Sequence, residues 1–489
     1  MKRFLVFLAA VLFVLPVFGK QIVIYHTSDT HGFFYPEEDL DTGRQWGGFA
    51  ALKALVNKEK QPYLLLDGGD WSSGTAEVKN TKGRAAITMM NAVGYNAAAI
   101  GNHDNEFGND NLLKNLKLFN FPVLNANIVD SRTSSLLSGT KPFEIFDVNG
   151  AKVAVIGLGI KDEYNNDHFK FKSYITALKE TLPLVQKHNP DLIVLLIHDS
   201  CCDTRTPGRI NNKVLAQKFP EINIILGGHY HKEYSEVIGK TLLVESGSRI
   251  KKVSKITVEL DDKTASSVLI PLYIDETGED AAVKKVADSA RVPGLDDVIH
   301  GYADAYLSRF PTDDKCSDSP LDNWVADTVS KYTPEADVAM GNALVTRMSI
   351  PKGKITQRTM TEAFPFDIEL MYVEVDGRWL KDFIRAGIKD GRSLFTYHGL
   401  TAGYNVKNKK IKDLEVYIKG KKVENWKKYI IATNEHIASG KTEGWMFKKI
   451  GAEKKRLVPA PGVREILIKE IQESGPLYPK EVCRLKQLN

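Results

Sequence analysis

The sequence predicts a layered α/β domain followed by a second half of mixed α+β structure. Three observations lead to this prediction. In the first half, short β-rich apolar runs alternate with helical stretches, as in a sheet covered by helices. Several of these runs are wholly apolar, such as residues 192–197, which indicates central strands covered on both faces. From about residue 271 the regular alternation ends and lysine becomes more frequent.

The expected strands of the first half are short and are bounded by turns or helices. They cover residues 21–26, 63–67, 97–100, 123–125, 152–157, 192–198, 222–226, 241–245 and 253–260. The expected helices lie between them, at residues 48–58, 84–93, 109–118, 174–188 and 213–218. This order of elements is the pattern of an α/β layered domain.

The predicted domain division lies where the alternation ends. Residues 275–280 are acidic with Thr and Gly, and helical patterns follow at 281–290 and 295–310. At one domain per roughly 100–200 residues, a chain of 489 residues suggests two or three domains. We therefore predict a first domain at residues 20–271, a helical connector at 272–312 and a second domain at 313–489.

The N-terminus has the form of a targeting signal. Lys2 and Arg3 precede an apolar run at residues 4–18, which is shorter than the roughly 20 residues of a membrane span. Val17 and Gly19 suit cleavage before Lys20. We predict a signal peptide at residues 1–19, with a retained anchor as the alternative. The mature protein is then exported, to the periplasm or outside the cell, and is not bound to a membrane.

Composition restricts the possible partners. Hydrophobic residues make up 43% and charged residues 26% of the chain, which excludes disorder as the main state. The formal net charge is only +5, so a dedicated binder of nucleic acid polymers is not expected. The oligomeric state stays open, and so does the pairing of the four cysteines, Cys201, Cys202, Cys316 and Cys483.

Five of the predicted apolar runs lead into side chains that metals favour. These segments are Asp29-Thr30-His31, Asp67-Gly68-Gly69-Asp70, Gly101-Asn102-His103-Asp104, His198-Asp199 and Gly227-Gly228-His229-Tyr230-His231. At the carboxyl ends of strands in one α/β sheet, they converge on one crevice. Imidazole, carboxylate and amide groups suit Zn²⁺, Mn²⁺ or Fe²⁺. Each segment alone is weak, but five in a fixed order predict a site for two metal ions that clamps a phosphoryl group.

The order of these segments resembles that of calcineurin-like metallophosphoesterases. The runs GNHD-x-E-F-G and GGHYH, with residues 245–248, are similar more narrowly to the secreted 5′-nucleotidase family, which includes UDP-sugar hydrolases and 2′,3′-cyclic nucleotide phosphodiesterases. The second half resembles the same family at residues 323–327, 342–347, 351–356, 364–366 and 429–440. The resemblance covers nearly the whole mature chain. It implies a layered α/β/β/α metallophosphoesterase domain followed by a smaller α+β substrate-binding domain.

The resemblance also implies a role for each candidate metal ligand. One divalent ion is assigned to Asp29, His31 and His231. The other is assigned to Asn102, His198 and His229, and Asp70 is the bridging ligand. The identity of the ions, zinc, manganese or iron, stays open.

The implied catalytic residue is His103, which does not bind metal. It would stabilise the phosphoryl oxygens or protonate the leaving group. In the family an Asp three residues later orients this His. Glu106 stands at that position here, and Asp104 is a competing candidate.

The substrate half departs further from the family. Asn342 and Arg347 remain, but the glycines of the family's N-x-G-G-I-R segment are replaced by bulkier residues. His398 and His436 stand in the stretches where the family has two aromatic residues that hold the base. The phosphoesterase chemistry is therefore expected, whereas the nucleotide specificity is in doubt.

The leading hypothesis is a secreted phosphohydrolase with two metal ions. It would act on a small-molecule substrate, a nucleoside 5′-monophosphate or a related nucleotide, nucleotide sugar or cyclic nucleotide, by attack of metal-activated hydroxide on phosphorus with His103 assisting. One alternative is a metal-dependent thiol-sulfate hydrolase that acts on a carrier adduct. Another is a non-catalytic surface protein that binds metal or nucleotide.

Overall fold

The computed structural model describes residues 21–39, 42–160, 168–201, 210–313, 315–342, 346–366, 368–389, 392–407, 410–478 and 482–488. The predicted signal peptide, residues 1–19, lies outside these ranges. The chain forms two compact units. The first contains the described residues up to Ser73 together with Lys82–Ser289, and the second contains Gly74–Thr81 together with the described residues from Ala290 onward.

A seven-stranded sheet forms one layer of the first unit. Its order is β18 (Thr264–Pro271), β17 (Lys252–Glu259), β1 (Gln21–Thr27), β4 (Tyr63–Asp67), β5 (Ala97–Ala98), β6 (Val123–Leu124) and β9 (Thr140–Lys141). Strands β1, β4, β5 and β6 pair in parallel. Strand β17 pairs antiparallel to β1 on one side and to β18 on the other.

A six-stranded sheet forms the second layer. Its order is β10 (Phe143–Val148), β11 (Ala151–Leu158), β13 (Leu192–Ile197), β14 (Ile224–Gly227), β16 (Thr241–Ser246) and β15 (Glu233–Ile238). The four inner strands are parallel. All six residues of β13 are buried, as its apolar sequence predicts.

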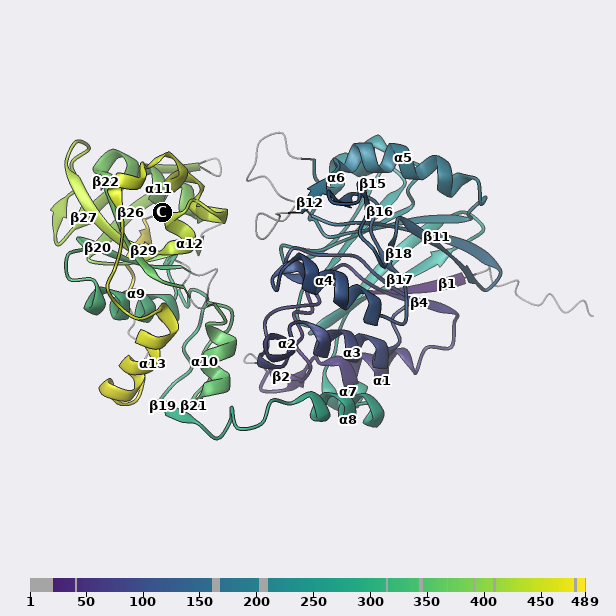
Figure 1. Cartoon of the computed structure of the whole chain (residues 1–489), viewed down its shortest axis with the longest axis horizontal. Helices are drawn as coiled ribbons and strands as arrows, with labels where there is room; N and C mark the ends of the chain where they lie inside the picture. Colours follow the sequence, from purple (N-terminus) through teal and green to yellow (C-terminus); the bar gives the residue numbers. More distant parts are fainter. Residues whose placement is uncertain are drawn as a thin grey trace, which may run out of the picture. The chain divides into compact units, whose positions relative to one another are not determined.

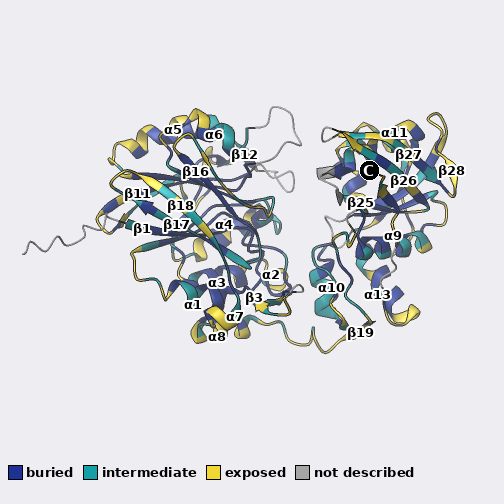
Figure 2. Cartoon of the chain, turned by 180° about the vertical axis from the view of Figure 1, so that it is seen from behind, coloured by how far each residue is buried: buried dark blue, intermediate teal, exposed yellow. Residues whose placement is uncertain are grey.

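The two sheets pack face to face and are covered by helices. One core joins β1 and β4 to β11, β13 and β14, and a second joins the other face of the six-stranded sheet to α5 (Tyr174–Gln186) and α6 (Asn212–Lys218). Helices α1 (Phe49–Val56) and α3 (Arg84–Val93) lie beyond the other sheet (Figure 1). The first unit is therefore a layered α/β/β/α domain, with the strand interiors buried and the outer helix faces exposed (Figure 2).

Shorter elements complete the first unit. They are β2 (Glu37–Glu38), β3 (Gln45–Trp46), η1 (His103–Asn105), α4 (Asn109–Asn115), η2 (Leu116–Leu118), β7 (Ile128–Asp130), β8 (Ser135–Leu136), β12 (Phe169–Phe171), α7 (Ile274–Thr277) and α8 (Ala281–Ala290).

The second unit is built on two antiparallel or mixed sheets. One has the order β25 (Phe395–His398), β20 (Val338–Asn342), β29 (Lys428–Asn434), β22 (Leu370–Asp376) and β30 (Lys455–Leu457). The other has the order β28 (Lys421–Lys422), β27 (Lys410–Ile418), β26 (Leu400–Lys407) and β31 (Leu485–Gln487). Its other elements are α2 (Ala76–Thr81), β19 (Ile299–Ala303), α9 (Pro320–Tyr332), β21 (Gly353–Thr356), α10 (Gln357–Ala363), α11 (Gly377–Gly387), β23 (Ile388–Lys389), β24 (Arg392–Ser393), α12 (Glu435–Ala438), η3 (Thr442–Lys449), η4 (Ala452–Lys454) and α13 (Val463–Ser474).

The helical pattern predicted at residues 295–310 is wrong. Part of this segment forms β19, which pairs antiparallel with β21. The strand also packs closely on α13, because a Cβ on Gly301 would lie 2.5 Å from Ile471. Packing between distant parts of the chain therefore decides this segment, and of the predicted connector at 272–312 only α7 and α8 are α-helical. The two units divide at Ser289, within that connector.

A short segment of the N-terminal half, α2, belongs to the second unit. Glu77 of α2 is buried and accepts a hydrogen bond of 2.6 Å from Arg358 of α10. Lys79 donates to the carbonyl of Pro365 at 2.8 Å. The chain thus contributes a helix to its second unit soon after Asp70, and this contribution has no signal in the sequence pattern.

The structure pairs Cys316 with Cys483 in a disulfide, which links the segment before α9 to the segment before β31. Cys201 is also disulfide-bonded, and Cys202 lies outside the described residues. In the part of the chain that the structure describes, every helix is too short or too polar to span a bilayer.

Candidate metal centre

The candidate metal ligands lie at the carboxyl ends of parallel strands. Asp29 and His31 follow β1, Asp70 follows β4, and Asn102 follows β5 in the seven-stranded sheet. In the six-stranded sheet, His198 follows β13, whereas His229 and His231 follow β14. Because parallel strands present their carboxyl ends at one edge, each sheet delivers its polar residues to the same place. The packing of the two sheets brings both sets together.

The backbone at these positions is unusual. Asp29, His31, Asp70, His229 and His231 all have positive φ, between 47° and 77°. Residues with a Cβ are uncommon in this left-handed region. Each such conformation costs on the order of 1–3 kcal/mol, so it persists only where the surrounding structure holds it. Five strained positions in one cluster indicate a site held in place for function.

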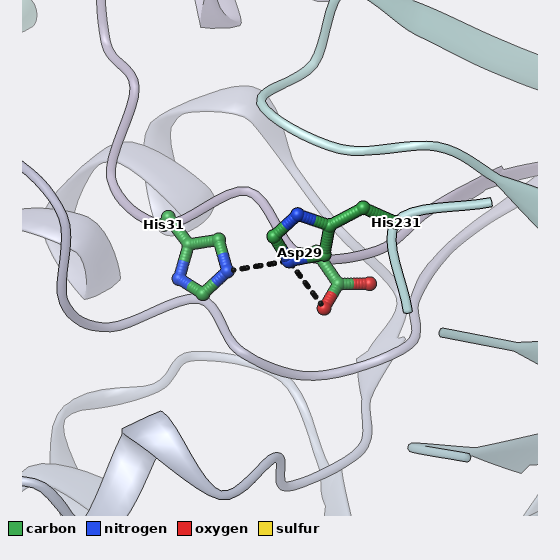
Figure 3. A group of neighbouring side chains, drawn as sticks. All are labelled: Asp29, His31 and His231. Carbon is green, nitrogen blue, oxygen red and sulfur yellow. Dashed lines mark hydrogen bonds and ion pairs between the residues drawn. The ribbon is translucent and has the colours of Figure 1, made fainter. Parts of the chain in front are cut away.

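The first group of ligands consists of Asp29, His31 and His231, whose ligand atoms lie within 4.8 Å of one another. The Nε2 atoms of His31 and His231 are 3.1 Å apart, and Asp29 Oδ1 is 3.4 Å from His231 Nε2 (Figure 3). Two hydrogen bonds fix the Asp29 carboxylate, since Ser28 Oγ and the His229 backbone N–H both donate to it. Two imidazole nitrogens facing a carboxylate form a suitable donor set for one divalent cation.

The second group consists of Asp70, His198 and His229, again within 4.8 Å. His198 Nδ1 donates to the carbonyl of Gly68 at 2.8 Å, which directs Nε2 into the site. His198 Nε2 lies 3.2 Å from Asp70 Oδ2, yet it is buried and forms no hydrogen bond. Asn102 Oδ1 is also buried without a hydrogen-bond partner. Buried polar atoms are seldom left so, and a cation would satisfy both.

Asp70 lies between the two groups. Its Oδ2 atom is 3.2 Å from His198 Nε2 and 3.9 Å from His31 Nε2. A carboxylate that reaches one ligand of each group has the position of a bridging ligand. The residues present therefore fit a pair of divalent ions.

The electrostatics of the site favour positive charge. Burial acts to raise the pKa of Asp29, but the neighbouring His231 holds that pKa below its usual range. Burial acts to lower the pKa of the His198 imidazole, yet the adjoining Asp70 raises it to about 10. The two buried carboxylates thus attract a proton to His198, and a divalent cation would supply positive charge at the same place.

His103 stands beside this centre with Glu106 behind it. His103 Nδ1 is 3.0 Å from Glu106 Oε2, and the His103 ring is in edge contact with the His31 ring. Among the residues that the structure describes, the competing candidate Asp104 forms no hydrogen bond with the His103 ring. Its carboxylate accepts backbone N–H groups instead. Of the two acids weighed from the sequence, Glu106 is the one whose carboxylate contacts the His103 ring.

Two of the four predicted substrate residues, Arg347 and His436, lie near each other in the second unit. Asn342 ends β20 and is buried. The guanidinium of Arg347 lies 5.3 Å from the ring centre of Phe366. His436 of α12 is close to the same guanidinium, since burial, Lys441 and Arg347 together lower its pKa to about 4. Lys441 is not among the substrate residues predicted from the sequence. Only its position in the stretch after His436 could have pointed to it.

The structure does not bring His398 to these residues. In the pairing of β20 with β25, His398 lies opposite Ala339, whereas Phe395 lies opposite Asn342. His398 is therefore at the other end of β20. There its Nδ1 is 2.7 Å from Asp327 Oδ1, and Arg484 donates to the same oxygen at 2.6 Å.

Comparison with known proteins agrees with this geometry. A family described as calcineurin-like phosphoesterase matches residues 22–233, and one described as 5′-nucleotidase, C-terminal domain, matches residues 299–449. The curated NAD 5′-nucleotidase of Haemophilus influenzae is 24% identical over 531 residues, which cover 88% of this chain and 86% of that protein.

Two solved structures from Thermus thermophilus share the fold over almost the whole chain. A 5′-nucleotidase precursor has a TM-score of 0.81 with 21% identity and covers 96% of this chain and 99% of its own. The sulfate thiohydrolase SoxB has a TM-score of 0.77 with 18% identity and covers 97% and 98%. The family matches at residues 22–233 and 299–449 show that the chain belongs to the 5′-nucleotidase family of metal-dependent phosphoric ester hydrolases, which use two divalent ions.

Proposed function

We propose that the protein is an exported enzyme that hydrolyses nucleoside 5′-monophosphates or closely related nucleotides. The observation that carries the proposal is the pair of ligand groups around Asp70, with His103 beside them. The family supports nucleotide phosphohydrolysis in general. The 5′-monophosphate is preferred here because the matched C-terminal family and the Haemophilus influenzae relative are both named as 5′-nucleotidases.

The proposed ligands are those that the sequence predicts. Asp29, His31 and His231 would hold one ion, Asn102, His198 and His229 would hold the other, and Asp70 would contact both. When bound, such a pair neutralises phosphoryl oxygens and supplies hydroxide at neutral pH. Support comes from the clustering of the ligand atoms within 4.8 Å and from the two buried atoms that lack hydrogen bonds.

His103 is proposed to act on the substrate directly. Glu106 accepts from Nδ1, and this hydrogen bond fixes the orientation of the imidazole ring. The other nitrogen, Nε2, would then donate to a phosphoryl oxygen as charge develops there, or give its proton to the leaving alkoxide. This role requires no contact between His103 and the metal ions.

The substrate is proposed to be oriented by the second unit. Within that unit, Arg347 would offer its guanidinium to an anionic group of the substrate, and Asn342 and His436 would contact other parts of the molecule. Phe366, which packs against Arg347, offers an aromatic face beside it. His398 does not take part in this proposal, because it pairs with Asp327 at the other end of β20.

The test uses residues 20–489 loaded with Mn²⁺ or Zn²⁺ and compares His103→Ala. Phosphate release is measured from nucleoside 5′-monophosphates, ADP, ATP, 2′,3′-cyclic AMP, UDP-glucose with a coupling phosphatase, and p-nitrophenyl phosphate. Fast, metal-dependent turnover of a 5′-monophosphate that is lost in His103→Ala supports the proposal. Turnover of p-nitrophenyl phosphate alone contradicts the proposed substrate and leaves the metal chemistry intact.

A further arm separates the sulfur-based alternative. Release of sulfate from a thiol-sulfate adduct on a peptide cysteine, with no release of phosphate from any nucleotide, would overturn the proposed reaction. Export is tested separately, by the mass of the mature N-terminus recovered outside the cytoplasm. A start at Lys20 supports export with cleavage, whereas a chain that begins at Met1 and is recovered only from the cytoplasm contradicts export.

A further inference from the structure

Asp104 is buried next to the metal centre but takes no part in the proposed reaction. It follows His103 in the 3-10 turn η1 and is 1% exposed. Its Oδ2 atom accepts the backbone N–H of Gly101 at 2.7 Å and of Asp70 at 3.1 Å. Its Oδ1 atom accepts the backbone N–H of Ser72 at 2.8 Å. One carboxylate thus binds the loop after β4 to the loop after β5.

Asp70 makes the reciprocal contact. Its Oδ1 atom accepts the backbone N–H of His103 at 2.7 Å. Each loop therefore supplies a carboxylate to backbone donors of the other. The three hydrogen bonds that Asp104 accepts are buried, so breaking one of them would leave a polar group without a partner away from water. The two loops form one fixed unit.

The loops are also closer than most residues would allow. A Cβ on Gly101 would lie 2.1 Å from Asp70 Oδ1 and 2.4 Å from Asp70 N. The glycine permits this approach, and Asp104 holds it. Because Asn102 and His103 stand between Gly101 and Asp104 in the chain, the same contacts fix where these two residues lie relative to Asp70.

We infer that Asp104 is a positioning residue for the reaction. Its carboxylate sets the place of Asp70 relative to Asn102 and His103, so that the proposed bridging ligand, a ligand of the second ion and the phosphoryl-binding imidazole move as one. This inference rests on the proposed function for the roles of those three residues. A buried carboxylate with a merely structural role would affect stability and leave the geometry of bound ions unchanged.

The first test is Asp104→Asn in residues 20–489 loaded with Mn²⁺. The amide keeps the shape of the side chain but turns a donor toward one of the three N–H groups. Electron paramagnetic resonance detects whether two bound Mn²⁺ ions are exchange-coupled. We expect the coupled spectrum of the unsubstituted protein to change in Asp104→Asn while two ions still bind, and we expect kcat to fall about 10- to 100-fold with KM nearly unchanged.

The matched control is Asp130→Asn. Asp130 is a buried carboxylate of the same unit that accepts the backbone N–H of Arg132 at 2.9 Å and also its guanidinium. We expect this substitution to lower the melting temperature and to leave the Mn²⁺ spectrum and kcat unchanged. If Asp104→Asn alters the melting temperature alone, as Asp130→Asn does, the inference is overturned.

Asp104→Glu guards against a variant that fails to fold. The longer acid keeps both acceptor oxygens but displaces them by one methylene, so its spectrum is expected to be altered less than that of Asp104→Asn and its kcat to be partly recovered. If Asp104→Glu and Asp104→Asn both fold and both show an unaltered Mn²⁺ spectrum and an unaltered kcat, the inference is overturned. The spectrum needs no substrate, so an inactive wild type with a coupled Mn²⁺ pair contradicts the proposed substrate, whereas a wild type without such a pair contradicts the proposed ligands.

Discussion

The metal centre and the substrate residues lie in different units and were predictable to different degrees. Each candidate metal ligand stands one to four residues beyond a buried parallel strand of the first unit. The direction of the strand alone sends such a residue to the sheet edge. The substrate residues come instead from a strand end, a loop and a short helix of the second unit, and their meeting depends on strand register.

The contrast between His229 and His398 shows what this means. His229 follows β14, and any parallel arrangement of that strand takes it to the metal centre. His398 ends β25, which is antiparallel to β20, so its place relative to Asn342 is set by the pairing of one strand with another. Sequence motifs at the ends of parallel strands are therefore more reliable guides to a site than motifs on antiparallel strands.

The largest expected effect is that of Asp70→Asn. If one carboxylate serves both ligand groups, its loss weakens the binding of both ions. We expect kcat to fall by about 10³-fold or more, equivalent to roughly 4 kcal/mol, and the metal content to fall below two ions per chain by atomic absorption. Asp130→Asn serves as the control. Full metal content in Asp70→Asn would mean that the two groups do not share this residue.

A smaller effect is expected for the dyad beside the metals. His103→Ala removes a group proposed to act only on the substrate, so kcat should fall about 10²- to 10⁴-fold while two ions stay bound. Glu106→Gln keeps an acceptor for Nδ1 but replaces the charged carboxylate by a neutral amide, which binds the ring less strongly, and its kcat should fall less. Loss of an ion in His103→Ala would mean that His103 is a metal ligand, and this would contradict its proposed role as a group that acts only on the substrate.

The fold of the first unit was predictable because its strands are apolar and regularly spaced. The buried strand at Leu192–Ile197 is the clearest case. The edge strands β15 and β18 were missed, and they read as polar segments because alternate residues face solvent. Helix α2 was missed for another reason, since its burial of Glu77 depends on Arg358, far along the chain.

Within the site, the sequence could identify the ligands but not the contacts that hold them. Side chains at strand ends have a local signal, whereas the carbonyl of Gly68, which fixes His198, carries no sequence signal at all. The choice between Asp104 and Glu106 also needed coordinates. Both acids follow His103 closely, and only the course of the turn decides which one faces the ring and which one faces the backbone.

A matched pair of substitutions sharpens the comparison within the second unit. Arg347→Ala removes a charged donor proposed to bind phosphate, and since such hydrogen bonds contribute roughly 1.5–3 kcal/mol, KM should rise about 10- to 100-fold. His398→Ala removes an imidazole that contacts Asp327 instead, so KM should stay within about twofold. Steady-state kinetics on the preferred nucleotide decide the matter. A larger rise in KM in His398→Ala than in Arg347→Ala would mean that the substrate binds beside His398 and not beside Arg347.

The smallest effect concerns stability beneath the metal centre. His26 is fully buried, Ser246 Oγ is 2.7 Å from its Nδ1, and burial lowers its pKa to about 3. The folded protein therefore keeps His26 neutral, whereas the unfolded chain binds a proton below its usual pKa of about 6.5. Stability is full above that value and is lost as the pH falls toward 3, by about 2 kcal/mol between pH 6.5 and pH 5.

Urea unfolding at pH 7 and pH 5, with chelator present to exclude metal binding, measures this loss. In His26→Gln the part of the loss that comes from this residue should disappear, although the variant is less stable overall because glutamine fills the space poorly. Comparison with His188→Gln controls for the removal of a histidine, since His188 is exposed at the end of α5. An equal pH dependence in wild type and His26→Gln would show that other groups carry it.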